Sequence, residues 1–172
     1  MNKKKLKYRV TYLEMNRKPS FDWPKNLKHK LSILLAESFP AWYFLFFYKQ
    51  VGKNYYWTDW LRKSEDEIDE FVNDKNVLLH TLIKDGWPVG FYMLDYRKKD
   101  ICDLSFFGLV DEVIGIGLGK YLLQTAILTA WESKKIKKLT VNTCSLDHKS
   151  AIYLYQKYGF TPVKYKDLEK TV

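Results

Sequence analysis

Three glycines at alternate positions constrain the fold of this chain more than any other feature of its sequence. Gly115, Gly117 and Gly119 stand between an apolar run that is typical of a strand and an apolar pattern with helical spacing. At such a junction the first N–H groups of the helix lack backbone partners, and the helix dipole attracts negative charge. Because glycine has no side chain to block a phosphate, the spacing indicates a phosphate cradle at a helix N-terminus.

A glycine-spaced turn alone is a weak signal, because a tight connection between a strand and a helix uses the same residues. Two familiar phosphate motifs do not fit the loop. A P-loop would place Ser or Thr after its lysine, whereas Tyr121 follows Lys120. A dinucleotide-binding fold would need a further glycine and a parallel βαβ unit close to the chain start, and neither is present. The loop is therefore either a tight turn or a phosphate site of another kind.

The order of the expected elements is mixed α+β, with antiparallel strands first and a parallel crossover later. Alternation of apolar and polar residues predicts strands, and apolar spacings of three and four predict helices. A capping-box spacing from Ser64 to Glu67 and a hairpin signal at Asp85-Gly86 set two of the boundaries. The expected strands are 5–13, 77–83, 89–96, 101–109, 139–143 and 160–165. The expected helices run from about Leu27 to before Pro40, and then over 42–51, 64–73, 119–134 and 147–158.

The chain of 172 residues is long enough to bury one core, so we expect a single domain over 1–172. No apolar stretch approaches the roughly 18 residues of a membrane helix. The basic residues at 3–5 precede no apolar region of the kind that a signal peptide needs. Cys102 and Cys144 are too few and too far apart for a disulfide framework or a zinc site. We therefore expect a soluble, cytoplasmic protein with two free thiols, no bound metal and no membrane partner.

The 29 basic and 20 acidic residues give a formal charge of +9, which favours an anionic partner. Nucleic acid and a phosphorylated cofactor would both satisfy this charge, and so would ordinary solvation of a basic surface. The lysines are dispersed along the chain, and no known RNA- or DNA-binding motif occurs in it. A nucleic-acid partner is therefore not expected, and a basic nucleic-acid-binding protein is the more distant alternative.

A second pattern lies downstream of the glycine loop. Within 147–160, Ala151 is followed by Tyr155 and then by the pair Gly159-Phe160, on one capped helix and its end. Together, the glycine loop and this helix resemble the signature of the GCN5-related N-acetyltransferase (GNAT) superfamily. That signature combines an Arg/Gln-x-x-Gly-x-Gly/Ala loop with an Asn-x-x-Ala-x-x-x-Tyr-x-x-x-Gly-Phe helix.

The resemblance covers Val77 to Tyr165, and the runs 106–109 and 143–148 resemble a poorly characterised bacterial subgroup. It implies a GNAT-type acyltransferase fold, in which a mostly antiparallel, twisted sheet is flanked by helices and splayed between its fourth and fifth strands. It also implies that acetyl-CoA is the donor, with its pantetheine arm in the V-shaped slot that the splay leaves. The acceptor would be an amine on a small molecule or a peptide, and both a monomer and a homodimer are open.

The resemblance further implies which residues hold the cofactor. Main-chain groups at the end of one strand would pair with the pantetheine amides, and N–H groups of the glycine loop would hold the pyrophosphate. The residues concerned are Phe107, Leu109, Val110, Gly115, Ile116, Gly117, Leu118, Gly119, Lys120 and His148. Ile114 stands where the family has Arg or Gln, so phosphate binding is expected to depend on backbone donors and on Lys120. His148 stands where the family has Asn.

Acetyl transfer to an amine needs an unprotonated amine, stabilisation of the developing oxyanion and a proton for the departing thiolate. By resemblance, Tyr155 is the proton donor. A main-chain N–H near Leu109, freed by a bulge at the end of its strand, is the oxyanion donor. Glu112 is the favoured base, although a surface role is equally open to it. A core role is the alternative for Tyr155. The other candidate bases are Asp95, Asp103 and His148.

Four residues are candidates for the acceptor side: Trp57, Trp60, Asp95 and Cys144. The aromatic residues within 55–60 would wall the acceptor or would belong to the core. Cys144 ends a strand that lines the slot, but direct transfer is typical of the family and a buried thiol is usually inert. We therefore expect an N-acetyltransferase that works through a ternary complex. A catalytically silent protein that binds CoA in a regulatory role is the nearer alternative.

Overall fold

One sheet collects strands from both ends of the chain. The computed structural model describes residues 5–25 and 29–171. The strands are β1 (Lys5–Met15), β2 (Leu31–Ala36), β3 (Val77–Lys84), β4 (Trp87–Asp95), β5 (Ile101–Leu109), β6 (Lys138–Cys144) and β7 (Thr161–Thr171). The helices are α1 (Ala41–Gly52), α2 (Glu65–Val72), α3 (Leu118–Ser133) and α4 (Ala151–Lys157), with 3-10 turns at Trp60–Arg62 and Asp111–Val113. The predicted α+β class is confirmed.

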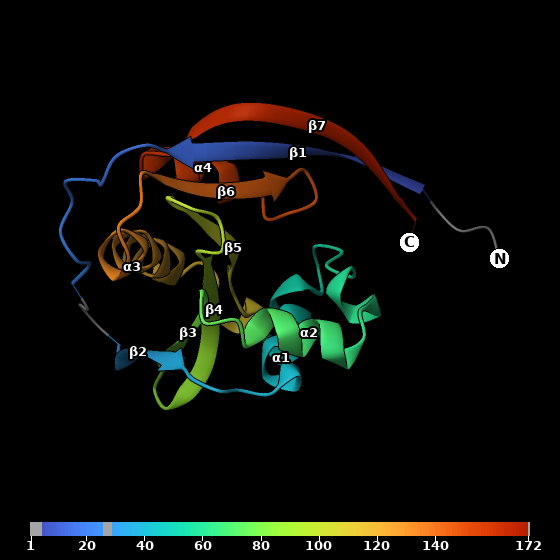
Figure 1. The fold of residues 1–172 in the computed structure, drawn as a ribbon, viewed down its shortest axis with the longest axis horizontal. Coiled ribbons are helices and arrows are strands. Elements are labelled where there is room, and N and C mark those ends of the chain that lie inside the picture. Colours follow the sequence, from blue (N-terminus) through green and yellow to red (C-terminus); the bar gives the residue numbers. More distant parts are fainter. Residues whose placement is uncertain (1–4, 26–28, 172) are drawn as a thin grey trace.

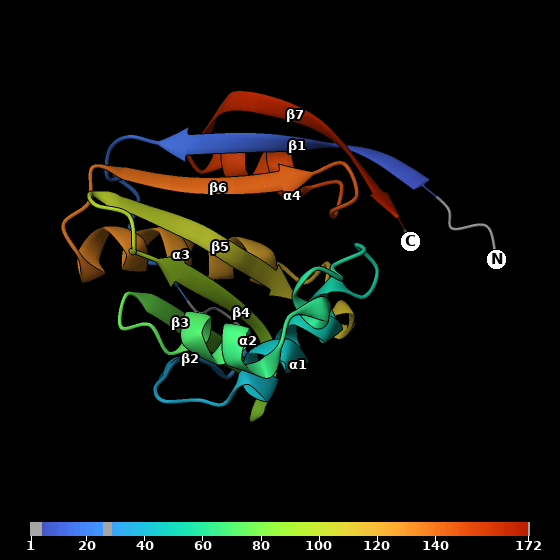
Figure 2. The same ribbon diagram turned by 45° about the vertical axis from the view of Figure 1, so that its right-hand side comes forward.

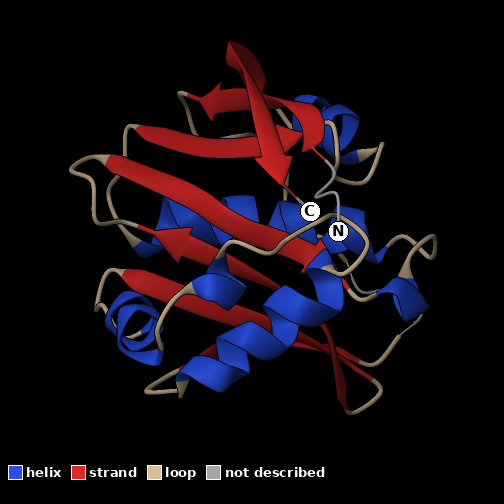
Figure 3. Ribbon diagram, turned by 90° about the vertical axis from the view of Figure 1, so that its right-hand side faces the viewer, coloured by secondary structure: helices blue, strands red, loops and turns tan. Residues whose placement is uncertain are grey.

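The strands of the described residues lie in the order β2-β3-β4-β5-β6-β1-β7. Every neighbouring pair is antiparallel except β5 and β6, which are parallel and joined through α3. Figure 2 shows the strands from β7 to β3 following one another from top to bottom. In Figures 1 and 3, α3 lies on the face of the sheet opposite to α1 and α2. The sheet is thus covered on both faces around β4 and β5.

β5 and β6 separate after a short stretch of pairing. They are in register only at Ile101–Lys138, Cys102–Leu139 and Asp103–Thr140. Beyond this point β5 continues to Leu109 and β6 to Cys144 without pairing with each other. These two strands are the fourth and fifth of the expected set, so the predicted splay of the sheet is confirmed.

Three local sequence signals produce the expected boundaries. The Ser64 hydroxyl accepts from the Glu67 N–H, and the Glu67 carboxylate accepts from the Ser64 N–H at 3.0 Å, so the capping box that starts α2 is confirmed. Asp85 and Gly86 both have positive φ, at 50° and 92°, as a tight hairpin between β3 and β4 requires. Gly159, with φ of 100°, ends α4 as expected.

The helix expected before Pro40 is wrong over its described part. Residues Leu31–Ala36 form β2, which pairs antiparallel with β3, and Leu27 lies outside the described residues. A short apolar run is compatible with the spacing of a helix and with that of a strand. Here the segment forms a strand because it can pair with the free edge of β3. Leu31 and Ile33 are half-buried, whereas Leu34 and Leu35 are exposed.

The two C-terminal elements also have different bounds from those expected. α4 begins at Ala151 rather than at Asp147 or His148, because the Asp147 carboxylate is used in a turn that comes before the helix. β7 extends to Thr171 because it pairs along the whole of β1, from Glu14–Thr161 to Lys5–Thr171. Its residues are mostly exposed, so they carry no apolar alternation that would indicate a long strand.

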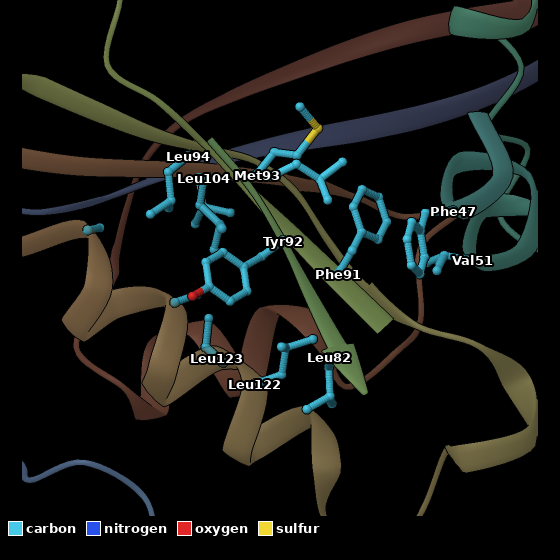
Figure 4. Close-up of a cluster of buried hydrophobic side chains, with 14 of the residues drawn as sticks. Phe47, Val51, Leu82, Phe91, Tyr92, Met93, Leu94, Leu104, Leu122 and Leu123 are labelled. Atoms are coloured by element: carbon cyan, nitrogen blue, oxygen red, sulfur yellow. The ribbon is translucent and has the colours of Figure 1, made fainter. Parts of the chain in front are cut away.

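The core is centred on β4, in which successive side chains point to opposite faces and residues 89–94 are all buried. Figure 4 shows Tyr92 directed toward Leu122 and Leu123 of α3, and Phe91 directed toward Phe47 of α1. The rings of Phe47 and Phe91 are stacked, with centroids 5.0 Å apart. A strand with both faces covered is expected to be apolar, and the buried residues 89–94 carry no charged side chain. Packing on β4 fixes α1 and α3 on opposite faces of the sheet, beside β5.

Cys102 is buried and Cys144 half-buried, and both are free thiols, as predicted. Within 5–25 and 29–171, no helix reaches the length and apolar character that crossing a lipid bilayer requires. The same residues contain no group of three or more His, Cys, Asp or Glu side chains suited to a metal ion.

His80 on β3 is a buried titratable group whose proton uptake opposes folding. Its side chain is 8% exposed and stacks on Tyr92 at 4.6 Å, and its Nδ1 has no hydrogen-bond partner among the described residues. Burial lowers its pKa from 6.5 to about 4. Below pH 6.5 the folded chain therefore binds fewer protons at His80 than the unfolded chain does. The free energy of unfolding falls as the pH drops from about 6.5 to about 4.

We expect His80 to remove about 2–3 kcal/mol of stability between pH 7.5 and pH 4.5. The His80→Phe variant keeps a ring on Tyr92 but does not titrate, so its free energy of unfolding should fall less over the same range. Urea unfolding of both proteins at the two pH values measures the difference. Equal losses in the two proteins would contradict the expectation, since all other titrating groups are shared.

Candidate functional site

A cavity of about 600 Å³ lies where β5 and β6 separate. Its lining comes from both sides of the sheet: from the glycine loop and the start of α3, and from the segment 55–60 that follows α1. β1, β5, β6, the region around α4, Tyr48 of α1 and Lys170 of β7 complete it. The cavity brings together these residues that the sequence singles out: Trp57, Trp60, Phe107, Leu109, Gly115, Gly117, Gly119, Lys120, Cys144, His148 and Tyr155.

Backbone conformation explains why two positions of the loop are glycine. Gly115 and Gly117 have φ of +90° and +89°, in the left-handed region that other residues rarely adopt. A Cβ added at either position would meet no atom within 4 Å. The two glycines therefore serve the turn itself, and the space in front of them is open.

The start of α3 offers unpaired N–H groups to this space. Gly117 is the N-cap and provides no side-chain cap, and the first turn contains no acidic residue. The first intrahelical bond runs from the Tyr121 N–H to the Gly117 carbonyl at 3.4 Å. The three preceding N–H groups belong to Leu118, Gly119 and Lys120 and have no acceptor within the helix. A helix end of this kind, with the exposed Lys120 beside it, suits a phosphate or another anion.

β5 turns part of its backbone toward the slot. The Val110 N–H donates to the Val89 carbonyl on β4 at 2.9 Å. Antiparallel strands bond to one neighbour at alternate residues, so Gly108 also bonds toward β4. Phe107 and Leu109 then direct their N–H and C=O groups to the other side, from which β6 has separated. These groups can pair with an extended ligand that lies in the slot.

The bulge that the resemblance implies lies elsewhere on β5. The register with β4 shifts between Met93 and Leu94, opposite Ser105, and not at the end of the strand. Leu109 stays in register with Gly90. The N–H of Leu109 faces the slot because β6 has moved away, and this corrects the predicted reason.

Tyr155 on α4 lines the cavity and is only 5% exposed. Its ring meets those of Phe107 and Phe160 edge-on, with centroids 6.1 and 5.8 Å away. Burial, and to a lesser degree the negative charge of Asp147, raise the pKa of this phenol above its ordinary value of 10. The hydroxyl therefore keeps its proton at neutral pH and is available as a donor.

Asp147 organises the turn between β6 and α4, a role that sequence reasoning missed. Its Oδ2 accepts hydrogen bonds from the Thr143 hydroxyl at 2.8 Å and from the Cys144 N–H at 2.7 Å. Its Oδ1 accepts from the Trp57 indole N–H at 3.1 Å, and the residue lines the cavity. The only sequence signal is an aspartate shortly after a strand end, which is typical of a helix cap as well.

Seven rings from β1, α1, the segment 55–60 and β5 line the cavity, and we call them the aromatic wall: Tyr8, Tyr48, Tyr55, Tyr56, Trp57, Trp60 and Phe106. The indoles of Trp57 and Trp60 also pack on Phe106, with centroids 6.0 and 5.9 Å away. The two tryptophans are therefore both lining and core, so the two roles that the sequence left open are compatible.

Lys170 on β7 ties the segment 55–60 to the other arm of the sheet. Its Nζ donates to the Tyr56 carbonyl at 2.8 Å and pairs with the Asp59 carboxylate at 3.0 Å. The Lys170 side chain is 12% exposed, whereas that of Asp59 is 72% exposed. Tyr56 has a φ of 57°, an uncommon value for a bulky residue, and the bond to its carbonyl helps to hold it there.

His148 and Cys144 line the cavity with their polar atoms already constrained. His148 is exposed, and its Nδ1 contacts the Ser150 hydroxyl at 2.7 Å and accepts from the Ser150 N–H at 3.3 Å. This is a local cap ahead of α4. Burial, followed by the charge of Asp147, raises the pKa of the Cys144 thiol. A protonated, half-buried thiol is a poor nucleophile.

Several predicted residues do not line the cavity. Glu112 lies exposed in the 3-10 turn Asp111–Val113. Both carboxylate oxygens of Asp95 are bonded to the Arg97 guanidinium at 2.7–3.1 Å. Asp103 accepts from the hydroxyls of Ser105 and Thr140. Val110 and Leu118 are buried, and Ile116 is exposed beside the loop. The cavity thus lacks Glu112, the favoured base, and Asp95, the predicted acidic contact to the acceptor.

Comparisons with known proteins were made on the sequence and on the fold. The sequence model of the Acetyltransferase (GNAT) family matches residues 36–160. No curated protein sequence matches the chain. Among solved structures, a GCN5-related N-acetyltransferase from Kribbella flavida is 15% identical, with a TM-score of 0.63 over 95% of this chain and 57% of that chain. One from Sphaerobacter thermophilus is 15% identical, with a TM-score of 0.59 over 95% and 51%.

A GNAT family acetyltransferase from Elizabethkingia anophelis, solved with acetyl-CoA bound, is 23% identical, with a TM-score of 0.58 over 80% of each chain. At these identities the likeness concerns the fold alone. The chain spans little more than half the length of the first two structures.

Proposed function

The chain belongs to the acetyltransferase (GNAT) family, and from this premise we propose that it is an acetyl-CoA-dependent enzyme that transfers an acetyl group directly to a primary amine. One observation carries the proposal. An uncapped, glycine-rich helix start, the unpaired end of β5 and a buried tyrosine with a raised pKa all line one cavity.

The cavity suits acetyl-CoA in its chemistry and its size. The N–H groups at the start of α3 and the Lys120 ammonium match a pyrophosphate. The free N–H and C=O groups of Phe107 and Leu109 match the amides of a pantetheine arm. A volume of about 600 Å³ is within the usual range of ligand pockets. One similar structure, from Elizabethkingia anophelis, has acetyl-CoA bound.

The residues of the slot have separate roles in this reaction. Bound acetyl-CoA supplies an acetyl group activated as a thioester. The Leu109 N–H donates to the acetyl oxygen as negative charge develops there. Tyr155 holds a proton on its phenol oxygen and gives it to the sulfur that leaves. A phenol has an ordinary pKa of 10, and burial raises that of Tyr155 further, so this proton is present at neutral pH.

Direct transfer is favoured over an acetylated cysteine. Cys144 lines the cavity, but burial raises the pKa of its thiol, so little thiolate is present at neutral pH. The proposed reaction therefore needs both substrates in the cavity at once, and the chain forms no covalent bond to the acetyl group.

A second candidate is a protein that binds acetyl-CoA without turnover. Ile114 is 40% exposed at the position where the family has Arg or Gln, and Glu112 lies outside the cavity. As a result, the cavity has fewer charged side chains beside the cofactor and the amine than an active enzyme of this family would be expected to have. Turnover separates the two candidates.

The proposal is tested first by thermal unfolding with and without acetyl-CoA. At about 100 times its Kd the ligand stabilises the folded chain by about 2.7 kcal/mol, which raises the Tm by about 5–10 °C. S-acetyl-N-acetylcysteamine, which lacks the pyrophosphate, serves as the control and should give a much smaller shift. No shift with acetyl-CoA would refute the proposed cofactor.

Turnover is then measured as release of the CoA thiol with a panel of primary amines. Release that depends on the amine supports the enzyme. A clear Tm shift without release on any amine supports the silent binding protein instead.

A further inference from the structure

Among the described residues, two carboxylates line the cavity, and their charges are compensated differently. Asp59 forms an ion pair with Lys170 at 3.0 Å and is largely exposed. Asp147 is half-buried, and its contacts are with the neutral donors of Thr143, Cys144 and Trp57. No lysine or arginine among the described residues forms an ion pair with Asp147. The cavity therefore contains one negative charge that has no cationic partner.

This charge lies among the groups where the reaction takes place. It contributes, after burial, to the raised pKa of the Tyr155 phenol and of the Cys144 thiol. It also contributes, after burial and the charge of Asp111, to the raised pKa of Tyr55 in the aromatic wall. Three hydrogen bonds hold the carboxylate in one orientation, and a carboxylate has room for about four. One acceptor direction is left for a ligand.

We propose that Asp147 binds the ammonium group of the acceptor, and that the acceptor is a cationic primary amine with an apolar or aromatic body and without a carboxylate. This inference rests on the proposed function. Rings attract cations through their faces, so the aromatic wall favours the same class of molecule.

The two lysines that line the cavity have other partners, so neither is left to pair with the carboxylate of an acidic acceptor. Two lysines line the cavity in the described part of the chain. Lys120 lies beside the glycine loop, where it serves the phosphates. Lys170 is 12% exposed and is already bonded to Asp59 and to the Tyr56 carbonyl. A free amino acid would bring a carboxylate that neither lysine can pair with, and its burial without a partner is costly.

The proton balance of the step is simple. The bound ammonium loses one proton to solvent water, which frees the nitrogen lone pair to attack the acetyl carbon. The bond from that carbon to sulfur breaks, and Tyr155 gives its proton to the sulfur. The nitrogen, now bonded to the acetyl carbon, gives its second proton to the Tyr155 phenolate, so that the amide, the CoA thiol and a neutral Tyr155 remain. Asp147 keeps its charge throughout, so it is a binding residue and not the base.

Binding of amines to the protein saturated with CoA tests the inference without turnover. Isothermal titration compares phenethylamine, a cation at neutral pH, with phenylalanine, which adds a carboxylate, and with 4-methylaniline, which is uncharged at pH 7. We expect phenethylamine to bind at least about 10-fold more tightly than phenylalanine. Comparable affinities for the two, or tighter binding of phenylalanine, would overturn the proposed acceptor class.

The Asp147→Asn variant then tests the residue. Its Kd for phenethylamine should rise by about 10- to 100-fold, while that for 4-methylaniline should change by less than about 3-fold. The matched control, Asp59→Asn, removes the ion-paired carboxylate and should leave both values within about 3-fold of wild type. A structural role for Asp147 would weaken both amines alike, and that result would overturn its assignment.

Failure of this inference can be told apart from failure of the proposed function. If CoA does not bind, the proposed function fails and the inference fails with it. If CoA binds and phenethylamine does not, the proposed function stands and the acceptor class is wrong.

Discussion

Replacing Gly117 with glutamate is expected to abolish acetyl-CoA binding while the chain stays folded. Gly117 has a φ of +89°, so any side chain there costs about 1–2 kcal/mol of stability. No atom lies within 4 Å of the added Cβ, so the side chain enters the open space before α3. Its carboxylate then occupies the N–H groups and repels a pyrophosphate. The Kd for acetyl-CoA should rise more than about 100-fold.

The chain offers a matched control at Gly86. This residue has a φ of +92°, its added Cβ would also meet nothing within 4 Å, and it lies in the hairpin between β3 and β4 outside the cavity. Gly86→Glu should therefore lose a similar amount of stability and keep the wild-type Kd. Titration calorimetry and thermal unfolding give both quantities. Retained binding in Gly117→Glu, or equal loss in both variants, would show that the glycine loop does not hold the cofactor.

Removing the Tyr155 hydroxyl is expected to slow the chemical step and to leave acetyl-CoA affinity nearly unchanged. A positioned proton donor contributes about 100- to 1,000-fold to the rate, so kcat of Tyr155→Phe should fall by that factor. The ring contacts with Phe107 and Phe160 do not involve the hydroxyl, so the fold should be retained. Steady-state kinetics with a reactive amine and calorimetry with acetyl-CoA separate the two effects.

Tyr158→Phe provides the comparison for this variant. Tyr158 follows α4 directly, is 8% exposed and packs on Phe21, but it does not line the cavity. Its kcat should stay within about 3-fold of wild type. A wild-type rate in Tyr155→Phe would remove Tyr155 from the mechanism and leave it as a core aromatic.

Local signals in the sequence were sufficient for most of the fold. The capping box at Ser64 and the hairpin at Asp85-Gly86 each involve a few neighbouring residues, and the structure contains both. β2 could not be predicted in this way, because the choice of strand over helix for Leu31–Ala36 depends on the distant edge of β3. The length of β7 depends in the same way on β1, at the other end of the chain.

The residues of the cavity show the same difference between local sequence signals and contacts made only in the folded chain. The glycine loop and Tyr155 lie at fixed spacings in the sequence, and both line the cavity. Carboxylates carry no such spacing. Only nearness to the predicted slot favours Glu112 in the sequence, and Glu112 lies outside the cavity. Asp147 was overlooked because its partner Trp57 is far away in the sequence, and only the folded chain brings the indole to the carboxylate.

The pairing of β1 has a consequence for the order in which the chain can fold during synthesis. β1 is made first, yet among the described strands it pairs only with β6 and β7, which are made last. The block of β2 to β5 with α1, α2 and α3 can gather its own contacts earlier, whereas β1 has to wait. The slot between β5 and β6 therefore has no second side until β6 has been synthesised. A nascent chain can have a core well before it can have a binding site.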